Sequence, residues 1–128
     1  MLKGLMSREA HTDVGANDPD LRGRTYAIPF GTVWETAVML ADGSLRGWKI
    51  VSVDECAGLI VARVDCRVLP VPSSVEVSIG LDDNAQTRVD ASARGPTRGV
   101  NLGVHAHRIR RLLRFLDRAL AAEPHQIL

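Results

Sequence analysis

The alternation of apolar and polar residues predicts four consecutive strands in the middle of the chain, at 47–54, 58–69, 73–83 and 85–94. In the last two strands, apolar side chains alternate strictly with polar ones, which is typical of a strand with one face on a core. The inward apolar residues of both strands have odd numbers. Directly opposed residues must share a face, so the numbers of two paired residues must add up to an even number. We therefore predict an odd-length hairpin loop at Asp83–Ala85.

The polar positions of these strands carry charges of both signs. They are Arg63, Asp65, Arg67, Glu76, Arg88, Asp90 and Arg94. This pattern is typical of a solvated sheet face with cross-strand ion pairs, each worth less than about 1 kcal/mol. A binding face for a charged partner is the alternative.

A first helix is predicted after a short strand at 24–30. Thr32 and Glu35 have the spacing of a capping box, in which each side chain bonds the other residue's backbone amide. Apolar residues then recur at helical spacing from Trp34 to Ala41, and Gly43 is expected to end the helix.

A second, longer helix is predicted over 103–122. Its apolar residues form one arc, made of Ile109, Leu112, Leu113, Leu116, Ala119 and Leu120. The opposite arc carries His107, Arg110, Arg111, Arg114 and Arg118, and we expect these side chains to be solvated and dispensable for folding. Aromatic residues are few, and none is expected among these arginines, so a nucleic-acid partner is not predicted.

The order of elements is therefore β-α-β-β-β-β-α. It predicts an α+β two-layer sandwich, in which both helices cover one face of a mainly antiparallel five-stranded sheet. A curved sheet gripping the long helix is the alternative. Residues 1–23 are rich in Gly, Asn, Asp and Pro and are expected to form a flexible N-terminal arm, with a single domain over 24–128.

Composition narrows the setting. The net charge of +1 divides into −4 for residues 1–87 and +5 for residues 88–128. No apolar run approaches the roughly 20 residues of a membrane span, and the first residues lack a signal peptide, so a cytoplasmic location is expected.

Cys56 and Cys66 flank one predicted strand, about 33 Å apart, and are expected to be reduced and buried. We expect no metal site and no cofactor.

The loop before the long helix, residues 95–101, is the main candidate site. Arg94, Arg98, His105 and Arg108 surround it, and free amides at a helix start attract anions. The four side chains are therefore candidate ligands for an anion. The alternative is structural: Arg108 bonds carbonyls of the loop or a strand end, or Asp90, while His105 packs and caps.

The segments "ASAR" (91–94) and "NLGVHAHRI" (101–109) resemble the C-terminal signature of a bacterial family of domains of unknown function, number 1499. That signature runs S-x-S-R, a short glycine-containing loop, then D-x-G-x-N-x-x-R-I. Arg94, Gly103 and Arg108 keep the pattern, whereas other positions of the signature differ. Upstream, "VWETAV", "GWKIVSVD" and "VEVSIGLDD" follow in the same order, so the resemblance covers about residues 25–120. It implies a bacterial source and the same architecture.

Catalytic patterns are missing from the sequence. It has no evident nucleophile–base pair, no cluster of metal ligands and no glycine-rich phosphate loop of known spacing. We therefore predict a non-catalytic binding or scaffold domain for an unknown protein or small-molecule partner, with homodimerisation left open. The first alternative is a binder of an anionic or apolar small molecule held between the sheet and the C-terminal helix. An enzyme that uses His105 is a weaker alternative.

Overall fold

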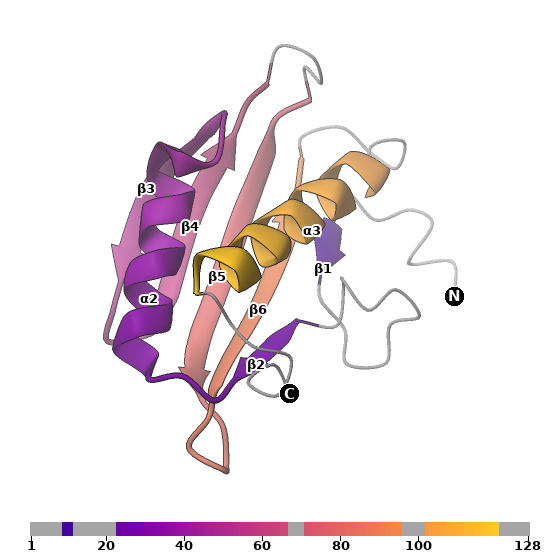
Figure 1. Cartoon of the computed structure of the whole chain (residues 1–128). Coiled ribbons are helices and arrows are strands. Elements are labelled where there is room, and N and C mark those ends of the chain that lie inside the picture. The colour runs from indigo at the N-terminus through magenta and orange to yellow at the C-terminus, as the bar shows by residue number, and fades with distance from the viewer. Residues whose placement is uncertain (1–8, 12–22, 67–70, 96–101, 121–128) are drawn as a thin grey trace, which may run out of the picture.

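Strands and helices in the computed structural model follow the predicted order. The structure describes residues 9–11, 23–66, 71–95 and 102–120, and for residues 9–11 and 102 it describes the backbone alone. The main elements are β2 (Arg24–Tyr26), α2 (Phe30–Met39), the wide turn η2 (Leu40–Ser44), β3 (Trp48–Asp54), β4 (Leu59–Val64), β5 (Ser73–Leu81), β6 (Thr87–Arg94) and α3 (Leu102–Ala119). Both helices lie on the same face of an antiparallel sheet (Figure 1). The predicted α+β sandwich is confirmed.

One strand was not predicted. β1 (Glu9–His11) lies within the segment expected to be an arm, and it pairs antiparallel with residues 92–94 of β6. β2 pairs with residues 87–89 of the same strand, so β1 and β2 share one edge of β6. From this edge the sheet continues in the order β6-β5-β4-β3. The rest of the predicted arm, 1–8 and 12–22, lies outside the described residues.

The hairpin between β5 and β6 has the predicted register. Val75 pairs with Ala93 and Leu81 with Thr87, so every pair adds up to an even number. The amide of Asp82 donates to the carbonyl of Gln86 at 2.8 Å, which closes a loop of Asp83, Asn84 and Ala85. Ala85 has a φ of 59°, the left-handed conformation expected at the third position of such a loop. The odd-length loop is confirmed.

The core lies between the sheet and the helices. The sheet contributes Ile60, Ala62, Val64, Val75, Val77, Ile79, Val89, Ala91 and Ala93, and the helices contribute Val33, Trp34, Ala37, Ile109, Leu112, Leu113 and Leu116. The predicted inward faces are therefore confirmed, with exceptions at element ends. Leu81 is 63% exposed because it occupies the last position of β5, and Ala119 is exposed at the end of α3.

The predicted start of the first helix is wrong. α2 begins at Phe30, its N-cap is Pro29, and no side chain caps it. Thr32 therefore lies inside the helix, where its carbonyl accepts a hydrogen bond from the Thr36 hydroxyl at 2.8 Å. The ring of Phe30 stacks on that of Trp34, one turn later, at a centroid distance of 5.8 Å. This contact favours a helix that already includes Phe30.

The end of the first helix is close to the prediction. α2 ends at Met39 and continues into η2, in which Gly43 has a φ of 110°. Only glycine adopts this conformation without strain, so Gly43 turns the chain out of the helix.

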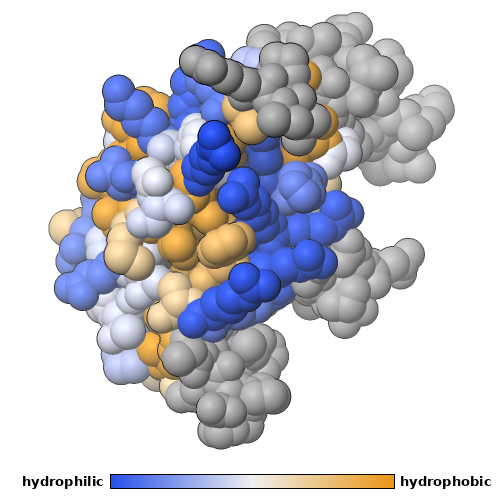
Figure 2. Space-filling view, turned by 45° about the horizontal axis from the view of Figure 1, so that its top comes forward, coloured by the Kyte–Doolittle hydropathy of each residue, from blue (hydrophilic) through white to orange (hydrophobic). Residues whose placement is uncertain are grey.

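The outward side of α3 is hydrophilic, as predicted. Hydrophilic side chains gather along the helix, with hydrophobic ones beside them toward α2 (Figure 2). The expectation that no aromatic residue lies among the arginines is wrong, because Phe115 lies between Arg111 and Arg118. Their guanidinium carbons are 5.5 and 5.4 Å from the centre of its ring. These cation–π contacts partly order the two arginines on the helix surface.

Asp117, near the end of α3, makes a contact with the sheet. Its carboxylate accepts hydrogen bonds from Arg24 Nε at 3.1 Å and from the hydroxyl of Tyr26. Burial, followed by the bond to Asp117, raises the pKa of Tyr26, so the phenol stays protonated and keeps donating. The contact ties β2 to the C-terminal part of α3.

Both cysteines are free thiols, but neither is buried. Cys56 is exposed in the turn between β3 and β4, and Cys66 is half-buried just after β4. The expectation of burial fails because both residues lie outside the strands, beyond the cover of the helices.

Within the described part of the chain, neither helix combines the length and the apolar character needed to cross a membrane.

Candidate functional site

The four candidate residues do not form one site. His105 and Arg108 belong to α3 and are buried between this helix and the inner face of the sheet. Arg94 is exposed, because alternation along β6 turns Ala93 toward the core and Arg94 away from it. Arg98 lies outside the described residues. The structure therefore places a buried pair on one face and Arg94 on the other.

The buried pair is completed by Ser73, the first residue of β5. His105 is 1%, Ser73 1% and Arg108 4% exposed. The Ser73 hydroxyl lies 2.6 Å from Nδ1 of His105 and accepts a hydrogen bond of 2.7 Å from Nη1 of Arg108. The same guanidinium nitrogen donates to the carbonyl of Val71. Arg108 therefore bonds backbone, as predicted, and its acceptor is the carbonyl two residues before the start of β5.

His105 is held as a neutral imidazole. Burial, followed by the charge of Arg108, lowers its pKa. Its Nε2 atom has no hydrogen-bond partner among the described residues. The edge of the ring faces Gly95, where a Cβ would lie 2.7 Å from Cε1 and 2.8 Å from Nε2. No space for a ligand atom is therefore left between the ring and Gly95.

Sequence reasoning missed Ser73, although a signal was present. By the alternation of β5, Ser73 shares the inward face with Val75 and Val77. A polar residue at an inward position must find a partner, because burying an unpaired hydroxyl is unfavourable. The partner comes from α3 and could not be identified without the fold.

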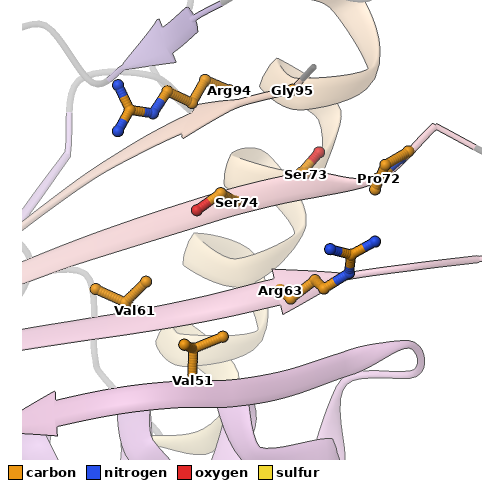
Figure 3. Close-up of a pocket in the computed structure, with 8 residues that line it drawn as sticks. All are labelled: Val51, Val61, Arg63, Pro72, Ser73, Ser74, Arg94 and Gly95. Carbon is orange, nitrogen blue, oxygen red and sulfur yellow. The ribbon is translucent and has the colours of Figure 1, made fainter. Parts of the chain in front are cut away.

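A hollow of about 630 Å³ lies on the opposite face of the sheet, which neither α2 nor α3 covers (Figure 1) and which we call the helix-free face. It is lined by Val51, Val61, Arg63, Pro72, Ser73, Ser74, Arg94 and Gly95. Figure 3 shows α3 behind the sheet, with Arg63, Ser74 and Arg94 in front of it. Two of the lining residues are arginines and none is acidic, so the hollow has a positive lining.

The strand register explains why these residues line the same hollow. Lys49 on β3 is opposite Arg63 on β4, Arg63 is opposite Ser74 on β5, and Ser74 is opposite Arg94 on β6. We call these four residues the basic row. Neighbouring strands lie about 4.8 Å apart, so the backbones of Arg63 and Arg94 are about 10 Å apart, with Ser74 between them. Side chains as long as arginine can reach a single group held above Ser74.

The two arginines of the hollow differ in their surroundings. Nε of Arg63 donates to the carboxylate of Asp65 at 2.7 Å, and this bond raises the pKa of Arg63. The guanidinium of Arg94 makes no hydrogen bond or ion pair within the described part of the chain. Both side chains are exposed, so they can rearrange around a ligand.

The basic row was missed because its register depends on features hidden in the sequence. A bulge in β3 shifts the pairing with β4 between Ile50 and Ser52. The connection from β4 to β5 includes Pro70 and Pro72, and its length does not fix which residues pair. The even-sum rule placed Ser74 opposite Arg94, but it did not extend to Arg63 or Lys49.

The expected ligand position between the sheet and α3 is occupied by the core. Ile109, Leu112, Leu113 and Leu116 are all fully buried against the sheet. Over residues 9–11, 23–66, 71–95 and 102–120, no three His, Cys, Asp or Glu side chains are grouped as metal ligands.

Comparisons of the chain with protein-family models, curated proteins and solved structures find no match. The resemblance of residues 25–120 to family 1499 therefore stays a prediction.

Proposed function

We propose that the protein is a non-catalytic binding domain that holds a small anion on the helix-free face of its sheet. The position differs from the one expected between the sheet and α3, while the ligand class, an anionic small molecule, is retained. In the proposed complex, Arg63 and Arg94 approach the anion from two sides, and the Ser74 hydroxyl donates from below.

The observation that carries the proposal is that Arg63, Ser74 and Arg94 pair directly across three neighbouring strands and line one hollow. A guanidinium can donate two parallel hydrogen bonds to a carboxylate or phosphate. The sheet fixes the three backbone positions, so only side-chain freedom is lost when a ligand binds.

A second candidate is the weaker alternative of an enzyme that uses His105. The 2.6 Å contact between Ser73 and His105 is the kind of pair that activates a nucleophile. Both residues are 1% exposed, however, and the Ser73 hydroxyl already accepts from Arg108. A substrate could not reach this hydroxyl without opening the core, so the contact favours a structural role.

The test is a thermal melt of the purified protein in phosphate or sulfate, compared with chloride at matched ionic strength. A bound anion stabilises the folded state by about 1.4 kcal/mol at ten times its Kd, so we expect a higher melting temperature in phosphate. Arg94→Ala should abolish this increase. The exposed position of Arg94 makes the stability of the variant in chloride close to that of the wild type.

Arg114→Ala is the matched control, because it removes an exposed arginine from α3, on the other layer. It should leave the phosphate effect unchanged. Equal melting temperatures of the wild-type protein in all three salts would exclude the proposed site.

A further inference from the structure

The helix-free face carries an apolar surface beside its cations. Val51 and Val61 line the hollow together with Arg63 and Arg94, and Val51 is 66% exposed. A solvated sheet face has no structural need for such a side chain, because its outward positions are normally polar.

The bulge in β3 is the reason that Val51 faces this hollow. Ile50 pairs with Ala62 and Ser52 with Val61, which leaves Val51 as the additional residue of the bulge. Ile50 packs against the core, whereas Val51 lies on the other side, beside Val61 (Figure 3). Bulges re-aim side chains in this way and recur next to binding sites.

The two surfaces adjoin. Val61 and Arg63 are two residues apart on β4 and therefore share the outer face. An anion above Ser74 would thus have Arg63 and Arg94 on the two neighbouring strands, and the two valines on the β4 and β3 side of it, with Glu76 as the residue opposite Val61. Inorganic phosphate would contact the cations and would leave the two valines uncovered.

We propose that the ligand is a soluble amphiphile with one anionic group, a carboxylate or phosphate monoester, and a short apolar part. The anionic group contacts Arg63, Ser74 and Arg94, and the apolar part covers Val51 and Val61. This assignment rests on the proposed anion site and specifies its ligand class. The hollow of about 630 Å³ is in the size range of sites for small organic molecules.

The experiment measures the binding of inorganic phosphate and of n-hexyl phosphate by titration calorimetry at matched ionic strength. Each methylene that leaves water strengthens binding by about fourfold, so two or three covered methylenes predict a preference of about tenfold or more for hexyl phosphate. Val51→Ser should reduce this preference to about twofold and leave phosphate binding unchanged.

Val53→Ser is the matched control. Val53 is an exposed valine of the same strand, 50% exposed, but it pairs with the inward residue Ile60 and does not line the hollow. The control variant should keep the full preference for hexyl phosphate.

The possible failures separate the two proposals. If phosphate binds and hexyl phosphate binds no tighter, the amphiphile is wrong and the anion site stands. If neither binds, both proposals are wrong. If the preference persists in Val51→Ser, the apolar part lies elsewhere and the inference fails. Binding to vesicles of phosphatidylcholine and phosphatidylglycerol without binding to hexyl phosphate would indicate a membrane surface and would also overturn it.

Discussion

Gly95 and His105 are in such close contact that a Cβ on Gly95 would lie 2.7 Å from Cε1 of the imidazole and 2.9 Å from the carbonyl oxygen of Pro72. The end of β6 thus rests on a side chain of α3. Gly95, at the start of the candidate loop, is therefore a glycine because the imidazole leaves no room for a side chain, and not because a phosphate must approach the backbone there.

We expect Gly95→Ala to destabilise the protein by about 1–3 kcal/mol, as is usual when a methyl group is forced into a packed site. Urea unfolding measures this loss. The double variant with His105→Ala should lose less stability than the sum of the two single losses, because the smaller side chain makes room for the methyl group. Strict additivity would show that the strain has another source.

Arg108→Ala should cost about 1–3 kcal/mol, because the Val71 carbonyl and the Ser73 hydroxyl lose a buried donor. Arg108→Lys should recover only part of this stability, since an ammonium lacks the planar fork of the guanidinium. Denaturant melts in chloride provide the measurement. A variant that keeps full stability but loses the phosphate effect would instead assign Arg108 to the anion site.

Acid should destabilise the protein through His105. Its folded pKa lies below the ordinary value of about 6.5, so below that pH the unfolded chain binds the proton first. The free energy of unfolding is therefore unaffected well above pH 6.5 and falls as the pH drops from there toward the lowered pKa. Urea melts at several pH values should show this slope, and His105→Asn, which can still bond Ser73, should reduce it. An unchanged slope in the variant would assign the acid sensitivity to other groups.

Asp65→Asn should strengthen anion binding. Asp65 competes for Arg63, and exposed ion pairs of this kind are worth up to about 1 kcal/mol, so the affinity for phosphate should rise by up to about fivefold. Asp83→Asn removes the same charge from the distant β5–β6 loop and is the control for the net-charge effect. Equal gains in both variants would mean that no direct competition occurs.

Local patterns predicted much of the fold. Alternation in β5 and β6 assigned the inward faces, and the even-sum rule fixed their register around Asn84, because both depend only on neighbouring strands. The capping-box prediction at Thr32 failed because the ring of Phe30 stacks on Trp34 and starts the helix earlier. β1 was missed because three residues without apolar periodicity form a strand only when β6 is beside them.

The candidate sites were less predictable, for a related reason. Arg108 was correctly singled out as a donor to backbone carbonyls, but its partners, Val71 and Ser73, are far away in sequence. Arg94 was expected to face the 95–101 loop together with Arg108, whereas the alternation of β6 places it on the other face of the sheet. Its neighbours in the basic row come from the pairing of β3, β4 and β5, which involves a bulge and a proline-containing connection.

The pairing of β1 and β2 with the same edge of β6 has a consequence for the order of folding during synthesis on the ribosome. Both strands precede β3, β4 and β5 in the chain, yet the partner of both among the described strands is β6, which follows all of these. β3, β4 and β5 can pair with one another as they leave the ribosome, whereas β1 and β2 have no partner strand until β6 is made. Contacts between distant parts of a chain form slowly because a long loop must close first. We therefore expect β1 and β2 to join the sheet after β3, β4 and β5, once β6 has been synthesised.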